Sequence, residues 1–267
     1  MMYKIKKMLL LFIKRPGRAV HLIINIMGNR KKCYVCKNTF SHFTKYKSGN
    51  EGVSDFLKIA QVIGSDVDNF GCMYCGSFDR ERHLFMFFDK LGIWEQMTNA
   101  SILHFAPESC LNKKIKTLSP TQYIPADLFP VNENIHRIDV TDIYYGDNTF
   151  DFVICNHVLE HVKDYYCGIK EIFRILKPGG TAILQTPYSV FFDHHFQEEN
   201  INTDELRTYF YGEVDHQRVF SEKQLFSDLG KAGFVIQVVK NETFFNEKIS
   251  KYYGVNHQED LIRVVKP

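Results

Sequence analysis

Long hydrophobic runs are absent from this sequence of 267 residues. No apolar stretch reaches the ~18–20 residues that a membrane span requires, and the two longest early runs, residues 8–13 and 19–24, are far shorter. Internal repeats and low-complexity tracts are absent as well. With 45% hydrophobic and 24% charged residues, the composition excludes a disordered chain, a collagen and a small disulfide scaffold. The length allows roughly one to two domains.

Acidic residues are absent from positions 1–50. The first is Glu51, whereas the same stretch holds 12 Lys and Arg residues, which leaves 21 basic against 31 acidic residues in the rest of the chain. A basic arm therefore precedes an acidic body. Such an arm favours anionic surfaces, either lipid headgroups or nucleic acid, and the acidic body argues against a broad nucleic-acid-binding face.

Residues 1–31 are predicted to form this arm as two short, basic, amphipathic helical segments. Polar residues recur there at helical spacing between Leu, Ile, Phe and Met, and Pro16 and Gly28 suit the start and end of the second segment. The arm can lie in the interface of a membrane or pack on the main domain. No small-residue cleavage site follows the apolar run, so the sequence predicts a cytoplasmic protein, peripheral at the inner membrane surface if the arm binds lipid.

Two matched cysteine pairs predict a structural zinc site within residues 32–77. Cys33 and Cys36 form one pair, Cys72 and Cys75 the other, and Gly76 suits the tight turn of a zinc knuckle. Thiols of a cytoplasmic protein stay reduced, which favours a metal over disulfides. A redox dithiol, two disulfides and four unrelated core cysteines are the alternatives.

The rest of the chain predicts an α/β fold. Residues 78–92 form an amphipathic connector helix, and from residue 93 short apolar runs alternate with helical stretches, which is typical of a mostly parallel sheet covered on both faces. Strands are expected at residues 101–106, up to 127, 135–138, 150–155, 181–186, 234–239 and 261–265, and helices at 164–176 and 221–230. Lys177-Pro178-Gly179-Gly180 is expected to stop the first of these helices.

Four segments carry a resemblance to a known family. They are IDVTDIYYGDNTFDFVICNHVLEHV at 138–162, EIFRILKPGG at 171–180, LHFAPE at 103–108 and DHQR at 215–218. Together with the four cysteines, they resemble the class I S-adenosylmethionine-dependent methyltransferases, in particular a bacterial subfamily with an N-terminal four-cysteine zinc module. The resemblance covers about residues 33–265 and implies a Rossmann-like, doubly wound, seven-stranded sheet over residues 93–267.

The resemblance also implies a cofactor site at the carboxyl ends of the strands. Asp127 could accept both ribose hydroxyls, Asp139 and the Val140 backbone lie where the family binds adenine, and Glu108 could receive the methionine portion. The further expected contacts are His104, Ala106 and Asn156. For any of the carboxylates, a helix cap or a solvated loop acid is the alternative. The turn after the first strand departs from the family because it contains Ala106 and Pro107 and no glycine.

The residues that follow the fourth strand suggest the chemistry. Asn156 and His157 stand at the same edge, and His157 is the favoured general base. The spacing of His157, Glu160 and His161 would place them on one helical face, where they could bind a divalent metal. This resembles the Glu-x-x-Glu-His site of some O-methyltransferases, with His157 in place of the first Glu. Local packing and pairing of Glu160 and His161 is the alternative.

Residues 187–220 are predicted to form a substrate lid, because loops of this length usually serve function. Asp215 and His216 could orient the acceptor or act as a base, and Arg218 could bind an anionic group. A structural polar cluster, which would also include His194 and His195, is the alternative.

Three functions remain in view from the sequence. The first is methyl transfer from S-adenosylmethionine to an oxygen of a sugar, glycan precursor or other small acceptor. The second is RNA methylation with the basic arm and zinc module gripping the nucleic acid. The third is a cofactor-free binding protein on a degenerate methyltransferase fold, which the missing glycines favour.

Overall fold

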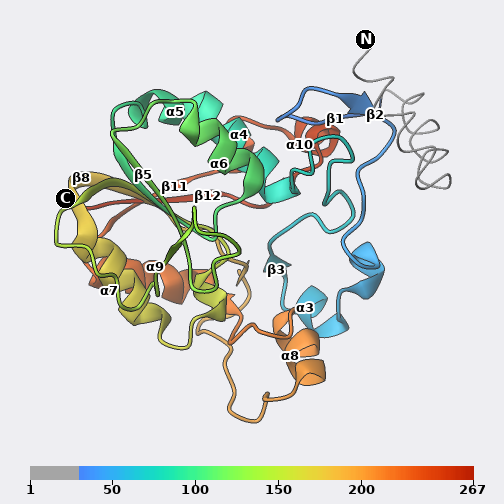
Figure 1. Ribbon diagram of the computed structural model, residues 1–267. Helices are drawn as coiled ribbons and strands as arrows, with labels where there is room; N and C mark the ends of the chain where they lie inside the picture. Colours follow the sequence, from blue (N-terminus) through green and yellow to red (C-terminus); the bar gives the residue numbers. More distant parts are fainter. Residues whose placement is uncertain (1–29) are drawn as a thin grey trace.

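The computed structural model describes residues 30–267 (Figure 1). The arm predicted over residues 1–31 lies outside this part of the chain, apart from its last two residues. Among the residues described, none of the helices combines the length and hydropathy that crossing a bilayer requires.

Seven strands form the central sheet in the order β11-β12-β8-β7-β4-β5-β6. The strands are β4 (Ser101–Phe105), β5 (Gln122–Asp127), β6 (His136–Arg137), β7 (Phe150–Cys155), β8 (Leu176–Ile183), β11 (Val235–Val239) and β12 (Leu261–Val265). From β6 to β8 all neighbours are parallel, whereas β12 runs antiparallel to both β8 and β11. The predicted mostly parallel, seven-stranded, Rossmann-like sheet is therefore confirmed. Phe105 pairs with both Ala126 and Cys155, so β4, β5 and β7 end at one edge.

The start of β8 differs from the prediction. The strand was expected at residues 181–186, but it begins at Leu176, directly after α7 (Tyr165–Ile175), and includes the Lys-Pro-Gly-Gly segment. Leu176 pairs with Phe150, and the register then shifts before Thr181 pairs with Phe152. Gly179, with φ of 79°, makes this irregularity feasible because only glycine adopts that conformation at little cost.

Helices cover both faces of the sheet (Figure 1). On one face lie α4 (Asp79–Leu91), α5 (Ile93–Gln96) and α6 (Ser109–Lys116), and on the other lie α7 and α9 (Glu222–Lys231). Successive side chains of a strand point to opposite faces, so Ile102 packs with the first group and Leu103 with the second. Ser221 caps α9 as expected, since its side chain accepts a hydrogen bond from Gln224 N.

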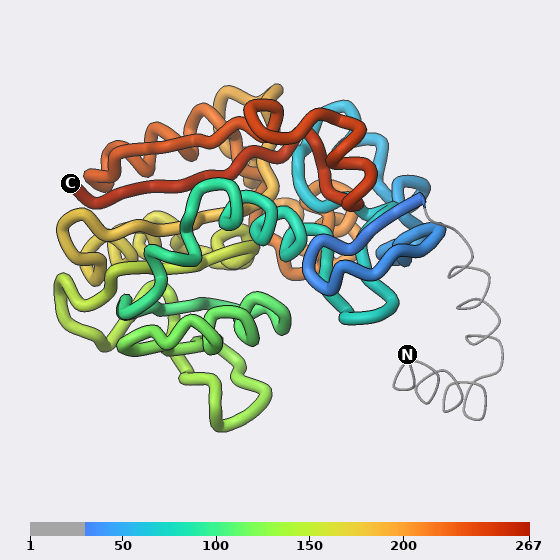
Figure 2. Tube along the Cα trace, turned by 90° about the horizontal axis from the view of Figure 1, so that it is seen from above, coloured from blue at the N-terminus to red at the C-terminus, as the bar shows by residue number. Residues whose placement is uncertain are grey.

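The connector helix α4 is buried on nearly every side rather than along one stripe. Its Arg82 is fully buried, and the five N–H donors of the guanidinium all point to backbone carbonyls. The carbonyls belong to Asn69, Phe70, Ser77, Tyr253 and Gly254. Arg82 thus ties the N-terminal cysteine module to the chain after α10 (Glu247–Tyr253), and Figure 2 shows these two segments side by side.

The segment between the cysteine pairs does not stay within its predicted module. Its strand β3 (Val62–Ile63) pairs with β9 (Tyr188–Ser189), which also pairs with β10 (Phe220–Ser221) of the predicted lid. Next to this small sheet, α3 (Asp55–Ile59) packs against α8 (Asp204–Tyr211), and both share one hydrophobic cluster. Residues 49–63 and 187–221 therefore form a joint layer beside the edge of the main sheet.

Candidate functional site

The glycine-free turn after β4 adopts a conformation that glycine usually adopts. Ala106 has φ of 44°, and its N–H donates to the carbonyl of Ala126 at 2.8 Å. A left-handed conformation costs a non-glycine residue about 1–2 kcal/mol. Ala106 thus adopts a strained, left-handed turn without glycine, and the strain lies at a strand end where the sequence predicts the cofactor site.

His104 and Glu108 flank this turn and bind each other. The His104 ring is fully buried, with Nδ1 2.9 Å from the Tyr123 hydroxyl and Nε2 2.9 Å from Oε2 of Glu108. Burial would raise the pKa of Glu108, but the hydrogen bond and charge of His104 lower it below its ordinary value. Both nitrogens of His104 thus contact protein groups, whereas Oε1 of Glu108 is buried and has no hydrogen-bond partner in the described part of the chain.

Asp127 and Asp139 each use one oxygen locally. Oδ1 of half-buried Asp127 accepts from Phe129 N at 2.8 Å, and Oδ1 of exposed Asp139 accepts from the N–H and hydroxyl of Thr141 at 2.8 and 2.7 Å. The loop-capping alternative is therefore present at both positions. Neither Oδ2 has a hydrogen bond to residues 30–267, and each carboxylate keeps one oxygen for a ligand. Val140 is buried in the hydrophobic core that also includes Ile169 and Ile172 of α7.

Asn156 and His157 follow β7 at the same edge. The Asn156 side chain is buried, and neither its Nδ2 nor its Oδ1 has a hydrogen-bond partner among residues 30–267. His157 has φ of 52°, and its N–H donates to the carbonyl of Gln185 at 2.7 Å. Its Nδ1 lies 3.2 Å from Oε1 of Glu160, outside hydrogen-bond geometry, and its Nε2 is buried without a partner in the same part of the chain.

The predicted metal set of His157, Glu160 and His161 needs correction. The left-handed backbone of His157 interrupts helical spacing, and only Leu159–His161 forms a short 3₁₀ turn, η2. The three groups that do converge are Glu160, His161 and His216, whose ligand atoms lie within 4.8 Å of one another. Burial would raise the pKa of Glu160, but His157 and the two other histidines lower it to about 2.

The lid residues divide into two groups. Asp215 and His216 reach the 3₁₀ turn: Oδ2 of Asp215 lies 3.0 Å from Nδ1 of His161, and His216 Nδ1 donates to Tyr211 O at 2.8 Å. His195 is structural, because its Nδ1 accepts from Ser221 N and its Nε2 lies 3.3 Å from Asp228. His194 is exposed.

The expected anion-binding role of Arg218 is wrong. Its side chain is buried, and its guanidinium donates to Gln197 Oε1 and to the carbonyls of Leu159, Val162 and Lys163. Arg218 instead fastens the lid to the turn that carries Glu160.

The four cysteines converge as predicted. Cys33 Sγ lies 3.7 Å from Cys75 Sγ, Cys36 Sγ lies 3.8 Å from Cys72 Sγ, and all four sulfurs fall within 4.8 Å. A tetrahedral zinc with Zn–S bonds of about 2.3 Å requires S···S separations of about 3.8 Å. The thiols are not disulfide-bonded, and the donor set therefore fits a closed zinc site.

Both cysteine pairs form the same turn. Lys37 N donates to Cys33 O and Gly76 N donates to Cys72 O, each at 2.9 Å, with φ of 59° at Lys37 and 76° at Gly76. Gly76 thus has a left-handed backbone conformation, which suits the tight turn expected for a zinc knuckle.

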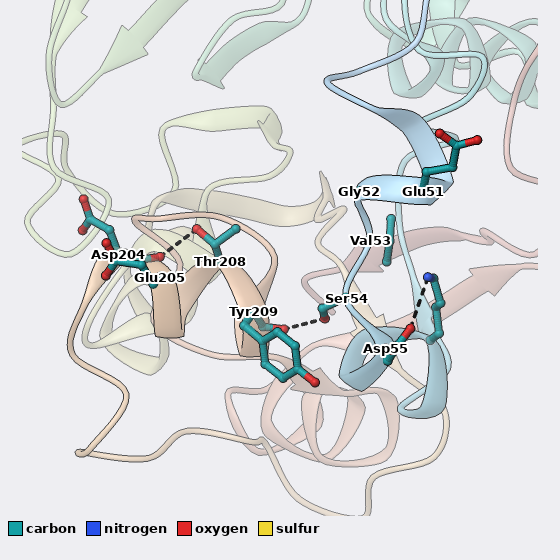
Figure 3. Close-up of a pocket in the computed structure, with 10 residues that line it drawn as sticks. Glu51, Gly52, Val53, Ser54, Asp55, Asp204, Glu205, Thr208 and Tyr209 are labelled. Carbon is teal, nitrogen blue, oxygen red and sulfur yellow. Dashed lines mark hydrogen bonds and ion pairs between the residues drawn. The ribbon is translucent and has the colours of Figure 1, made fainter.

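Two open hollows of about 660 Å³ lie away from the strand edge, and sequence reasoning missed both. The first lies between α3 and α8, where the Ser54 hydroxyl donates to Tyr209 O, and it is lined by Glu51, Asp55, Asp204 and Glu205 (Figure 3). The second is basic and aromatic and is lined by residues of β1 (Lys31–Lys32), α4 and α10. The chemistry-bearing residues gather at the strand edge instead, so we place the candidate site there. In the sequence, the only indication of the second hollow is the clustering of lysine and aromatic residues at positions 244–253.

Comparison with known proteins identifies a matching family and several similar proteins. A family model described as a methyltransferase domain matches residues 98–239. A demethylmenaquinone methyltransferase of Staphylococcus carnosus is 42% identical over 45 residues, which are 17% of this chain and 19% of that protein. A ubiquinone/menaquinone biosynthesis C-methyltransferase of Geotalea daltonii is 32% identical over 80 residues, which are 28% of this chain and 34% of that protein. Both alignments span a minor part of the relative's length.

Two solved structures are among those similar to this chain. An S-adenosylmethionine-dependent methyltransferase from Mesorhizobium loti gives a TM-score of 0.48 at 13% identity, over 67% of this chain and 97% of that one. A chain from the complex between the Haloferax volcanii Trm112 methyltransferase activator and a methyltransferase gives 0.46 at 16% identity, over 71% and 93%.

Proposed function

The chain belongs to the methyltransferase-domain family, and we propose that it transfers a methyl group from S-adenosylmethionine to an oxygen of a sugar, glycan precursor or other small acceptor. One observation carries the proposal. Buried polar groups without partners gather at the ends of adjacent strands β4 and β7: Oε1 of Glu108, the amide of Asn156 and Nε2 of His157. Leaving such a group unpaired costs about 1–3 kcal/mol, so a polar ligand that supplies the missing partners is favoured at this edge.

The residues present fit the cofactor. Glu108, positioned by His104, would bind the ammonium group of the methionine portion, and Asp127 would accept the ribose hydroxyls with its remaining oxygen. Asp139 and Val140 would flank the adenine. The cofactor, when bound, supplies a methyl group that its sulfonium makes electrophilic.

His157 would act on the acceptor. Oε1 of Glu160 faces Nδ1 of the ring at 3.2 Å without a well-aligned hydrogen bond, and the Thr186 hydroxyl donates to Oε2 of Glu160 at 2.9 Å. The unpartnered Nε2 can take the hydroxyl proton while the acceptor oxygen forms its new bond to the methyl carbon, whose bonding pair stays on sulfur. Asn156 would orient one of the two reactants.

Calorimetric titration with S-adenosylmethionine and S-adenosylhomocysteine tests this function. We expect both to bind, and we expect Asp127→Asn to weaken binding at least about tenfold because a charged hydrogen bond is lost. The matched control is Asp193→Asn, an exposed lid acid that forms an ion pair with Lys223, which should bind normally. Absence of heat and of a thermal shift at millimolar cofactor would support a cofactor-free binding protein instead.

We also propose that the four cysteines hold one structural zinc.

We further propose that the basic arm and the hollow next to it contact an anionic membrane surface from the cytoplasmic side. The second hollow, lined by residues of β1, α4 and α10, supports this contact. Five basic residues line it, and among residues 30–267 only Lys251 of these five has an acidic ion-pair partner; they are Arg30, Lys31, Lys90, Lys248 and Lys251. The sequence before Arg30 continues the same charge with apolar residues between.

RNA methylation is the second candidate, because Tyr34, Tyr252 and Tyr253 in the same hollow could stack on bases beside the lysines. Steeply salt-dependent RNA binding, lost when residues 1–29 are deleted, would favour it over the membrane.

A further inference from the structure

We propose that Glu160, His161 and His216 form a binding site for a divalent transition metal, separate from the four-cysteine site. The turn η2 supplies the first two ligands and the lid supplies the third, so residues 55 positions apart meet. One carboxylate and two imidazoles form a donor set that suits Zn²⁺, Mn²⁺, Co²⁺ or Ni²⁺ better than Ca²⁺ or Mg²⁺.

Each of the three side chains is held by an outer partner at one atom and free at another. His216 donates from Nδ1 to the Tyr211 carbonyl at 2.8 Å, which leaves Nε2 as the atom without a proton. His161 Nδ1 lies 3.0 Å from the carboxylate of Asp215. The Glu160 carboxylate accepts from the Thr186 hydroxyl at Oε2. Metal-binding histidines almost always use their second nitrogen in this way, since the outer bond fixes both tautomer and ring orientation.

An independent observation points to a ligand at this place. Glu160 is only 1% exposed, yet within residues 30–267 its Oε1 accepts no well-aligned hydrogen bond, since the nearby Nδ1 of His157 at 3.2 Å is poorly oriented for one. A buried carboxylate oxygen compensated this weakly is costly, and a cation bound there would reduce that cost. His157 does not belong to the group, although its Nδ1 lies 3.2 Å from the same oxygen.

Three protein ligands leave coordination positions open, which distinguishes this site from the closed cysteine site. Thr186 and His157 border the site, and they follow shortly after the ends of β8 and β7. If the proposed methyl transfer holds, the open positions would receive the acceptor oxygen and lower the pKa of its hydroxyl. Metal binding itself does not depend on that function.

Cobalt titration tests the site. The full chain is first saturated with one equivalent of zinc at the cysteines, dialysed, and titrated with Co²⁺ while visible spectra and bound cobalt are measured. We expect one further equivalent of cobalt with d–d bands and no sulfur-to-cobalt charge-transfer band. His161→Ala should weaken this binding at least about 100-fold, and exposed Asp215→Asn about 10-fold or more, because outer partners contribute that much. His194→Ala, an exposed lid histidine, is the matched control and should bind like wild type.

The outcomes separate cleanly. Failure of wild-type protein to bind a second equivalent at millimolar Co²⁺ would overturn the proposal, as would equal binding by wild type, His161→Ala and Asp215→Asn, all shown to be folded by thermal unfolding. The calorimetric titration with S-adenosylmethionine is run on the same zinc-saturated samples without cobalt. Binding of cobalt without binding of the cofactor would support the metal site and contradict the methyltransferase proposal. Binding of the cofactor without binding of cobalt would contradict the metal site and leave the methyltransferase proposal standing.

Discussion

His195 should make the stability of the lid depend on pH. Burial, opposed by the carboxylate of Asp228, lowers the pKa of this imidazole from 6.5 to about 4, and nearby Arg218 and His194 disfavour its charge further. The unfolded chain therefore binds a proton at His195 below about pH 6.5, whereas the folded chain binds it only below about pH 4. The contribution of His195 to the free energy of unfolding is thus complete above the pKa of the unfolded chain and is lost as the pH falls. Between about pH 7.5 and about pH 5 this difference amounts to at most about 2 kcal/mol.

Urea unfolding at the two pH values measures the effect. His195→Gln should be less stable than wild type at neutral pH, because the contacts to Ser221 and Asp228 are altered, but it should lose about 2 kcal/mol less on acidification. His194→Gln is the control, since that exposed neighbour should leave the wild-type slope unchanged. Ionisable groups away from residue 195 have the same surroundings in all three proteins and cancel in the comparison. An identical pH slope in wild type and His195→Gln would refute the reasoning.

Three further predictions concern the sites. Metal analysis of protein purified without chelator should give about one zinc per chain, and Cys36→Ser should lose the metal and unfold at a lower temperature; a folded, metal-free wild type would contradict the zinc site. His157→Ala should lower kcat about 100-fold or more while the Kd for S-adenosylmethionine stays within about twofold, and an equal loss of both would assign His157 to cofactor binding or structure. Deletion of residues 1–29 should abolish sedimentation with vesicles containing anionic phosphatidylglycerol, whereas neutral phosphatidylcholine vesicles should bind neither form; equal binding to both vesicle types would exclude the electrostatic contact.

The central sheet was predictable because its signals are local. The strand at residues 150–155 was placed to the residue by its apolar run, and Ser221 was recognised as the start of α9 by its capping side chain. The cysteine pairs were equally clear, since each turn is specified within six residues, from Cys33 to Asn38 and from Cys72 to Ser77.

The details of the candidate site were not predictable because they depend on single backbone angles and on distant contacts. A left-handed φ at His157 moves that ring off the helical face that its spacing to Glu160 suggested. The pairing of Glu160 with His216 and the burial of Arg218 are consequences of how the lid folds back. Likewise, nothing in the residues of β3 specifies its pairing with β9, because two-residue strands carry no periodic pattern.

The bonds of Arg82 have a consequence for how the chain matures on the ribosome. Two of its five carbonyl partners, at Tyr253 and Gly254, lie 171 and 172 residues further along the chain and are made long after it. Until these two carbonyls emerge, the guanidinium lacks part of its shell and resists burial, so the region around the cysteines cannot close fully before Gly254 has been made. Synthesis of the segment around Gly254, rather than of the cysteine segment itself, thus sets the earliest moment at which the cysteine region packs into its final place.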